Sequence, residues 1–150
     1  MFHHNKKFYE NIIFQGLLNL EFLAIDNNQL TDLHSDLFVE LSGLQRLHIY
    51  DNLIERLDGQ LFRNNTVLNT IYMFGNRINA IQSNFIDNVP RLGRLDLQGN
   101  LCTQQLFVAQ GGVLQPPVAP ALQTCFRNFG GGNVRRFNMR LEGMLELDEL

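Results

Sequence analysis

Apolar residues recur along the middle of this chain with a fixed period of 24 residues. Each of four copies opens on a leucine, with a second apolar residue three positions later and a third two positions after that. These residues are Leu20, Leu23 and Ile25; Leu44, Leu47 and Ile49; Leu68, Ile71 and Met73; and Leu92, Leu95 and Leu97. The alternation at the end of each set predicts a short strand with one buried face. A period of this length indicates a solenoid of stacked copies, because one copy cannot bury its apolar face alone.

An asparagine follows every predicted strand at the same place in the copy. The four residues are Asn28, Asn52, Asn76 and Asn100. The chain must bend there, and the backbone groups of a buried bend need hydrogen-bond partners. We therefore expect the side-chain amides to form a structural ladder, each bonding backbone groups of its own and neighbouring turns.

The full pattern, L-x-x-L-x-L-x-x-N-x-L-x-x-L-x-x-x-x-F-x-x-L over about residues 9–102, resembles the leucine-rich repeat. The 24-residue length and the late Phe resemble the type common in animal extracellular proteins. The resemblance implies an α/β solenoid, a leucine-rich-repeat horseshoe. Its parallel β-sheet would be concave, its convex side irregular, and its end closed by a C-terminal cap and a short terminal helix. It does not name the ligand, because this family binds proteins, peptides, lipids and glycans.

We expect a leucine-rich repeat domain over residues 1–129, followed by a Gly hinge and an amphipathic helix over 130–150. The domain divides into a degraded partial repeat, three full repeats, and a last partial repeat with the cap. The corresponding ranges are 1–19; 20–43, 44–67 and 68–91; and 92–129. In the partial repeat, one period places Ile13, Phe14 and Leu17 in the slots of Leu37, Phe38 and Leu41. In the second repeat, Asn65 stands where Leu41 and Val89 stand in the others.

Composition narrows the function classes. A net charge of −3 argues against nucleic acid as a partner. No stretch approaches the 18 apolar residues of a membrane span. The first residues lack the apolar region of a secretory signal, although the repeat type is extracellular. We expect that the chain is a fragment of a secreted protein with further repeats upstream; the alternative is that residues 1–19 are a polar cap.

The two cysteines, Cys102 and Cys125, both follow the last Asn of the repeats. They are either two buried free thiols or one disulfide, and their place at the open end of the solenoid favours the disulfide. The pattern N-x-C, F and L-x-x-C-F around them resembles the caps of small insect leucine-rich repeat proteins, among them the mosquito leucine-rich immune proteins. That resemblance implies a role in innate immune recognition. Asn64-Asn65-Thr66 is a sequon, which predicts a glycan on Asn64 if it is not a chance match.

The four histidines have no nucleophile or second metal ligand at a motif spacing, and no phosphate-loop, nucleophile-elbow or H-E-x-x-H pattern occurs. We expect no enzyme activity, no catalytic residue, no metal and no cofactor. The residues between the buried strand positions should line the concave surface. The candidate partner-binding residues there are Arg46, His48, Tyr50, Tyr72, Phe74, Arg94 and Asp96.

Aromatic residues with Arg are typical of binding hot spots, whereas cross-strand aromatic pairs also brace a sheet. Four strands give a patch of roughly 300 Å², below the ~800 Å² per partner of a stable interface. We therefore favour a protein-binding module that is part of a larger surface. The alternative is a scaffolding protein, or an intracellular adaptor with free thiols, whose terminal helix makes the contacts. The helix predicted over 133–150 would also allow dimerisation.

Overall fold

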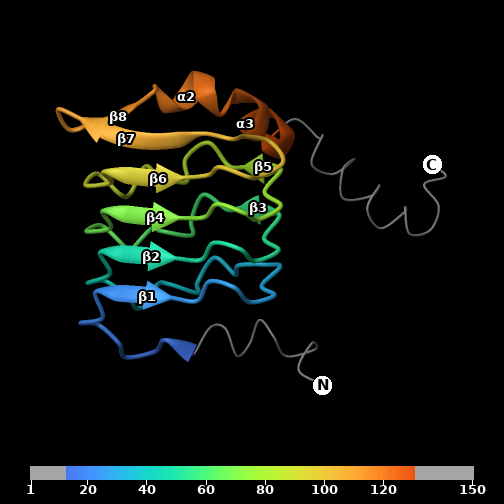
Figure 1. Ribbon diagram of the computed structural model, residues 1–150. Helices are drawn as coiled ribbons and strands as arrows, with labels where there is room; N and C mark the ends of the chain where they lie inside the picture. Colours follow the sequence, from blue (N-terminus) through green and yellow to red (C-terminus); the bar gives the residue numbers. More distant parts are fainter. Residues whose placement is uncertain (1–12, 131–150) are drawn as a thin grey trace, which may run out of the picture.

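Six strands form one sheet along one side of the solenoid (Figure 1). The computed structural model describes residues 13–130. In spatial order, the first four strands of the six-stranded sheet are β1 (Phe22–Ala24), β2 (Arg46–His48), β4 (Thr70–Tyr72) and β6 (Arg94–Asp96). They are parallel, and paired residues differ by 24 in sequence, as in Phe22 with Arg46. This register confirms the parallel sheet that the resemblance to the leucine-rich repeat implied.

The core lies between this sheet and the return segments. Leu47, Ile71 and Leu95, the central residues of β2, β4 and β6, are fully buried. Deeper in the first turns, phenylalanines one period apart stack on one another: Phe14, Phe38 and Phe62. Ring centroids are 6.3 Å apart for Phe14 and Phe38 and 5.9 Å apart for Phe38 and Phe62. Each turn is therefore buried by its neighbours rather than by itself.

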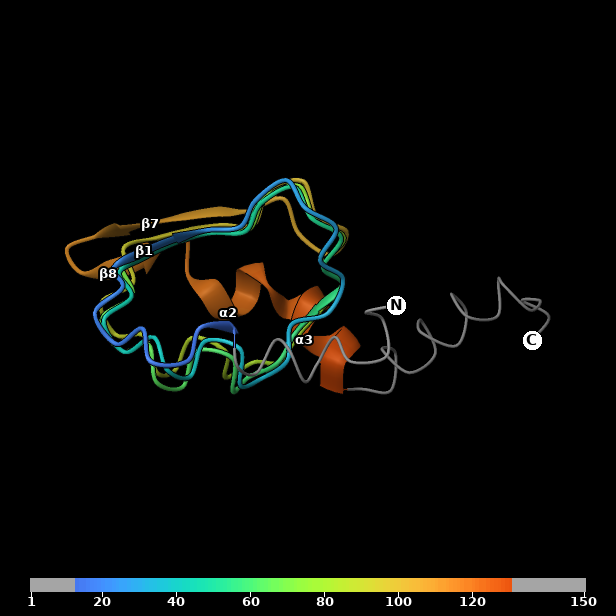
Figure 2. The same cartoon turned by 90° about the horizontal axis from the view of Figure 1, so that it is seen from below.

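The return side consists mainly of turns, as expected for an irregular convex side. It includes one two-stranded parallel sheet, formed by β3 (Arg56–Leu57) and β5 (Ala80–Ile81). Viewed along the solenoid, the successive turns follow one outline, with the six-stranded sheet on one side and the turns on the other (Figure 2).

The residue before each ladder asparagine has a left-handed backbone. The φ angles are 59° at Asn27, 56° at Asp51, 72° at Gly75 and 69° at Gly99. Asn, Asp and Gly are the residues that tolerate this conformation best, so each copy carries a suitable residue at its sharpest bend. The recurrence at one repeat position was not part of the sequence interpretation.

The asparagine ladder links one turn to the next. The Asn52 Oδ1 accepts hydrogen bonds from the backbone N–H groups of Asn28 and Leu30, both at 3.1 Å. Its Nδ2 donates to the carbonyl oxygens of Ile25 and Ile49, also at 3.1 Å. Asn76 and Asn100 bond in the same manner to the preceding turns. Asn28, by contrast, is exposed, and its amide donates within its own turn.

Asn65 is a further buried asparagine, in a slot that is apolar in the other repeats. It is fully buried, and its Nδ2 donates to the carbonyl oxygens of Phe38 and Leu41, both at 2.9 Å. Its Oδ1 is buried with no hydrogen-bond partner among the described residues. The amide therefore replaces apolar packing with two hydrogen bonds between turns.

The first described turn departs from the predicted slots. Phe14 is packed against the core, as predicted. However, 55% of the surface of Ile13 and 44% of that of Leu17 are exposed, so their assignment to buried positions was wrong. A solenoid residue is buried by the turns on both sides, and only one neighbouring turn lies within residues 13–130 here.

Residues 101–130 fold over the last repeat as a hairpin followed by two helices. The hairpin strands are β7 (Leu106–Gln110) and β8 (Val113–Gln115), joined by Gly111-Gly112, whose φ angles are positive. β7 pairs with β6 in the antiparallel direction and so extends the sheet. The helices are α2 (Val118–Ala121) and α3 (Gln123–Gly130). No strand was predicted in this segment, which was expected only to form part of the cap.

A disulfide joins Cys102 to Cys125 across this segment, with Cα atoms 5.2 Å apart. Cys125, on α3, is fully buried together with Leu122 and Phe107. The bond ties α3 to the turn that follows the last ladder asparagine. The helix predicted over 133–150, and the dimerisation assigned to it, lie outside the described residues. None of the helices within residues 13–130 is long and apolar enough to cross a membrane.

Candidate interaction face

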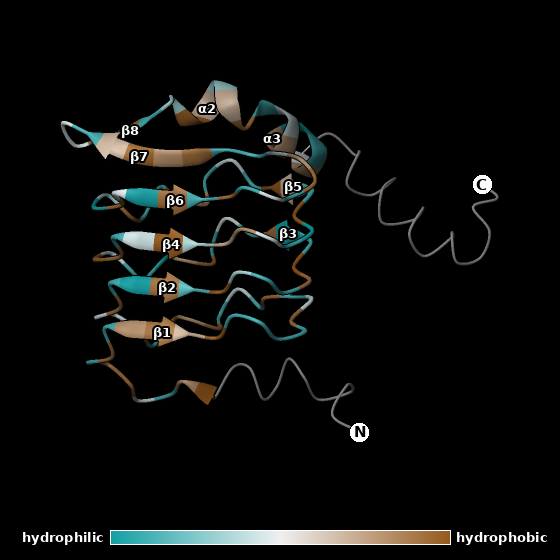
Figure 3. Ribbon diagram, in the orientation of Figure 1, coloured by the Kyte–Doolittle hydropathy of each residue, from teal (hydrophilic) through white to brown (hydrophobic). Residues whose placement is uncertain are grey.

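The outward side of the sheet brings the predicted partner-binding residues into rows across the strands. The first row is Phe22, Arg46, Thr70, Arg94 and Val108, and the second is Ala24, His48, Tyr72, Asp96 and Leu106. β1 is hydrophobic throughout, whereas β2 and β6 begin with hydrophilic residues (Figure 3). The face is thus a mixture of arginine, aromatic and aliphatic side chains, a composition seen in protein-binding surfaces.

Five rings form a connected group on this face, which we call the aromatic cluster. They belong to Phe22, His48, Tyr50, Tyr72 and Phe74. Tyr50 and Phe74 are stacked with ring centroids 4.4 Å apart, and His48 lies 4.8 Å from the rings of both Phe22 and Tyr72. Except for Phe22, which is exposed, these side chains are half-buried. The rings therefore expose part of their surface to solvent and contact one another across neighbouring strands.

His48 is the titratable group inside the cluster. Desolvation lowers its pKa below the ordinary value of 6.5, and the charge of Arg46 lowers it further, whereas Asp26 has the opposite effect. Its Nε2 is buried and has no hydrogen-bond partner in the described part of the chain. His48 therefore favours the neutral form and acts as a ring among rings.

Asp26 and Tyr50 form a polar edge of the cluster. The side chain of Asn27 donates a hydrogen bond to Asp26 Oδ2 at 2.9 Å, and this bond lowers the pKa of Asp26. Desolvation and the nearby charge of Asp26 raise the pKa of Tyr50. At neutral pH the Asp26 carboxylate is therefore ionised and the Tyr50 hydroxyl is neutral. This edge of the cluster thus carries the negative charge of Asp26.

Arg46 and Arg94 carry the positive charge of the first row. The Arg46 guanidinium lies over the Phe22 ring, with Cζ 4.8 Å from the centroid. Arg94 is half-buried, and its Nε is inaccessible to water. This Nε also has no hydrogen-bond acceptor among residues 13–130. Neither forms an ion pair with another residue of 13–130, where the ion pairs are those of Asp36 with Arg63 and with His34.

Two features of the face differ from the sequence interpretation. Asp96 is only 9% exposed, and its Oδ1 accepts a hydrogen bond from the backbone of Gln98 at 3.1 Å, so its carboxylate turns toward the chain. Leu106 and Val108 were missed, because no strand was predicted there. Val113, on β8, is 60% exposed and belongs to the same extension of the sheet.

Two hollows are lined by residues outside the rows of this face. A hollow of about 670 Å³ is lined by residues of the turns before the strands, including Leu18, Gly43 and Arg91. A smaller one, of about 400 Å³, lies on the return side near Asp32 and Asp58. No group of three or more His, Cys, Asp or Glu side chains within residues 13–130 could hold a metal ion.

Comparisons with known proteins agree with this architecture. Residues 18–78 and 42–102 match the family model described as leucine rich repeat, and together they cover more than half of the chain. The chain belongs to the leucine-rich repeat family. A search of curated protein sequences found no significant match.

Solved structures give a further comparison. The chain is similar to a chain in the structure of the Toll–Spatzle complex, described as a molecular hub in Drosophila development and innate immunity. The TM-score is 0.61 and the identity 31%, over 76% of this chain and 14% of that chain. For the glycosylated form of the complex, the TM-score is 0.58 and the identity 33%, over 59% and 12%. This chain therefore spans a small part of the length of these relatives.

Proposed function

We propose that this chain is a non-enzymatic, protein-binding module of an extracellular leucine-rich repeat protein, and that it binds through the sheet face that carries the aromatic cluster. The stacked pair of Tyr50 and Phe74, on the water-facing side of the sheet and next to Tyr72, is the observation that carries the proposal. Strand residues on a solvated face are normally polar. Grouped aromatic residues beside arginine are the composition of binding hot spots.

The hairpin enlarges the face that is available to a partner. The hairpin adds β7 and β8 to the four parallel strands, so the width rises to about 29 Å at ~4.8 Å per strand. With roughly 16 Å along the strands, the patch is on the order of 460 Å². It is still smaller than the ~800 Å² per partner of a standard interface. We infer that neighbouring loops or further repeats of the whole protein contribute the remainder.

Two observations support an extracellular location. A disulfide such as that between Cys102 and Cys125 persists in oxidising compartments. Asn64 is exposed, as a glycosylated residue must be; its Nδ2 donates to the Val39 carbonyl at 3.1 Å, which leaves one amide hydrogen for attachment. The similarity to the Toll–Spatzle complex supports innate immune recognition as the biological setting.

The binding role is tested with Tyr72→Ala. A random peptide library displayed on phage is selected on the wild-type protein, and each enriched peptide is remeasured with both proteins by fluorescence anisotropy. We expect the binding free energy to fall by about 2 kcal/mol or more, as for hot-spot aromatics, with little change in thermal stability, since Tyr72 is half-buried. Arg127→Gln, at an exposed position of helix α3, is the matched control and should bind normally.

The competing role is scaffolding, in which the rings only brace the sheet. Unchanged binding of every enriched peptide, together with lower thermal stability of Tyr72→Ala, would support scaffolding and overturn the proposal. The glycosylation of Asn64 has a separate test. Expression through a secretory pathway should give a band that shifts on glycosidase treatment, and Asn64→Gln should abolish the shift.

A further inference from the structure

We propose that the partner presents an acidic, extended protein segment. The segment would cross the strands along Arg46, Thr70 and Arg94 and end on the outer side of the β7–β8 hairpin. The proposal rests on the protein-binding function proposed above and gives that partner a chemistry. It is built on three observations: an arginine that lacks an anion, the spacing of two arginines in one row, and the aliphatic surface beside them.

Arg94 is the first observation. Its guanidinium has lost part of its hydration, because Nε is inaccessible to water, and no acceptor among residues 13–130 replaces that water. The nearest acid on the same strand, Asp96, is nearly buried and accepts its hydrogen bond from the Gln98 backbone. A partly dehydrated cation without an anion is unfavourable, and a carboxylate that reaches its terminal nitrogens would compensate it.

The second observation is the spacing along the row. Arg46 pairs with Thr70, and Thr70 pairs with Arg94, so the two arginines stand two strands apart. At ~4.8 Å per strand the separation is about 9.6 Å. In polyproline II conformation, side chains three residues apart project from the same side at about 9.3 Å. An acid-x-x-acid spacing in the segment therefore matches the two guanidinium groups.

The third observation is the end of the row. Val108 pairs with Arg94, and Leu106 with Asp96, so aliphatic side chains follow directly after the second arginine. Val113, on the next strand and paired with Gln110 rather than with Val108, is 60% exposed. An apolar residue that follows the second acid in the segment would lie on this hairpin surface and remove it from water.

A protein segment fits better than a sulfated glycan. The chain has a net charge of −3, and Asp26 lies on the same face, so a polyanion would be repelled beyond the two arginines. The aromatic cluster and the hairpin also offer apolar surface, which a peptide uses and a sulfate chain does not. We therefore expect the segment to have few acidic residues, spaced to match Arg46 and Arg94, rather than a continuous run of acidic residues.

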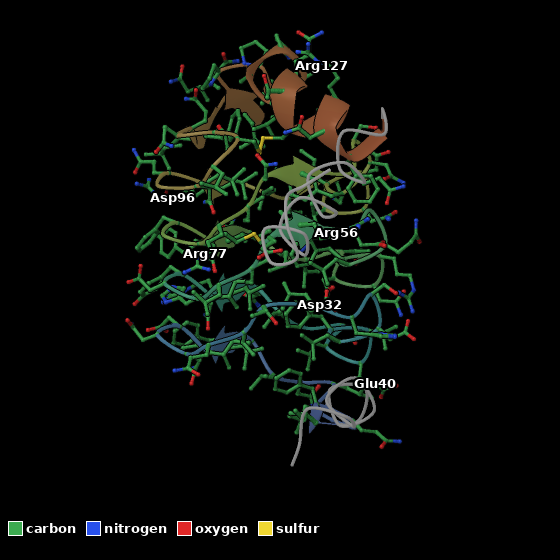
Figure 4. All side chains as sticks on the ribbon, turned by 90° about the vertical axis from the view of Figure 1, so that its right-hand side faces the viewer. Asp32, Glu40, Arg56, Arg77, Asp96 and Arg127 are labelled. Atoms are coloured by element: carbon green, nitrogen blue, oxygen red, sulfur yellow. A yellow bond between two sulfur atoms is a disulfide. The ribbon has the colours of Figure 1, made fainter. Side chains whose placement is uncertain are left out.

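The experiment uses the peptides enriched on the wild-type protein and a synthetic Glu-x-x-Glu-Leu peptide with its Gln-x-x-Gln-Leu counterpart. Binding is measured by fluorescence anisotropy against wild type, Arg46→Gln, Arg94→Gln and the control Arg127→Gln. Figure 4 shows that Arg127 lies on α3, apart from the sheet residue Asp96. We expect acidic sequences to be enriched, and affinity to fall roughly tenfold or more with either face variant or with the Gln peptide, but to change less than about twofold with Arg127→Gln.

The outcomes separate this inference from the proposed function. Neutral enriched peptides that need Tyr72 but neither arginine would overturn the acidic segment and leave the binding face intact. Peptides that depend on neither Tyr72 nor the arginines would overturn both. Retention on a heparin column that requires Arg94, without acidic peptide binding, would replace the segment by a glycan. Arg46 is exposed, so Arg46→Gln and the Gln peptide decide the matter even if Arg94→Gln does not fold.

Discussion

The ring of Tyr50 stacks on that of Phe74, with centroids 4.4 Å apart and an angle of 12° between the ring planes. The two residues come from successive repeats, 24 positions apart in the sequence. The pair therefore forms only when the turns are stacked in the correct register. It couples the water-facing surface of the sheet to the packing of the core beneath it.

A double-mutant cycle should detect this coupling. We expect Tyr50→Ala and Phe74→Ala to lower the free energy of unfolding by amounts that are not additive, with a coupling energy of about 0.5–1.5 kcal/mol. Chemical denaturation of the two single variants and the double variant provides the measurement. The control cycle combines Tyr50→Ala with Thr70→Ala and should be additive, because Thr70 pairs with Arg46, four positions before Tyr50 along the chain. An additive result for Tyr50 and Phe74 would mean that the stack contributes nothing to stability.

Asn52→Ala should destabilise the solenoid more than Asn28→Ala. Asn52 is buried and bonds to two successive turns, whereas Asn28 is exposed and donates only within its own turn. Loss of the Asn52 amide leaves buried backbone groups without partners, which costs roughly 1–3 kcal/mol. Denaturant midpoints of the two variants make the comparison. Equal midpoints would contradict the ladder as a source of stability.

Opening the disulfide should loosen the last turn of the solenoid. Cys102 and Cys125 are 23 residues apart, and closing a loop of that length stabilises the folded state by about 3 kcal/mol in the chain-entropy model. The Cys102→Ala/Cys125→Ala variant should therefore unfold at lower denaturant concentration. Mass spectrometry should show a gain of two hydrogens on reduction of the wild type. Two thiols that label in the unreduced, denatured protein would show that the bond does not form.

The stability of the protein should fall on mild acidification because of His48. Desolvation lowers the pKa of His48 below 6.5, so near that pH the unfolded chain binds more protons than the folded one. Its contribution to stability is present above about pH 6.5 and is lost as the pH falls toward the lowered pKa. NMR titration of the imidazole should give a midpoint below 6.5.

The matching control is His48→Gln, which should lose this part of the pH dependence. The comparison requires denaturation curves of both proteins at about pH 7.5 and about pH 5.5. Arg46 and Asp26 face the imidazole and act on it in opposite directions. A His48 midpoint above 6.5 would mean that Asp26 outweighs both burial and Arg46.

The sequence by itself determined the repeat, the parallel sheet and which strand residues face outward. This was possible because every copy of the 24-residue period has apolar residues at the same positions, which assigns one face of each strand to the core. A shift of one residue would expose Ile49 and Met73 and bury Tyr72. The ladder asparagines could also be predicted, because they recur at one position of the repeat. The cysteine pair could be predicted because both cysteines follow the last repeat asparagine.

Only the tertiary structure decided the remaining features. Asn65 is buried because the carbonyl groups of Phe38 and Leu41, on another turn, are within reach of its amide. Asp96 and Val108 owe their surroundings to a hairpin that adds to the sheet in the opposite direction, beyond the period of the repeat. These hydrogen bonds and strand pairings join residues that are distant in the sequence, and the spacing of apolar residues does not indicate them. The repeat pattern therefore determines the solenoid but not the hairpin that covers its last turn.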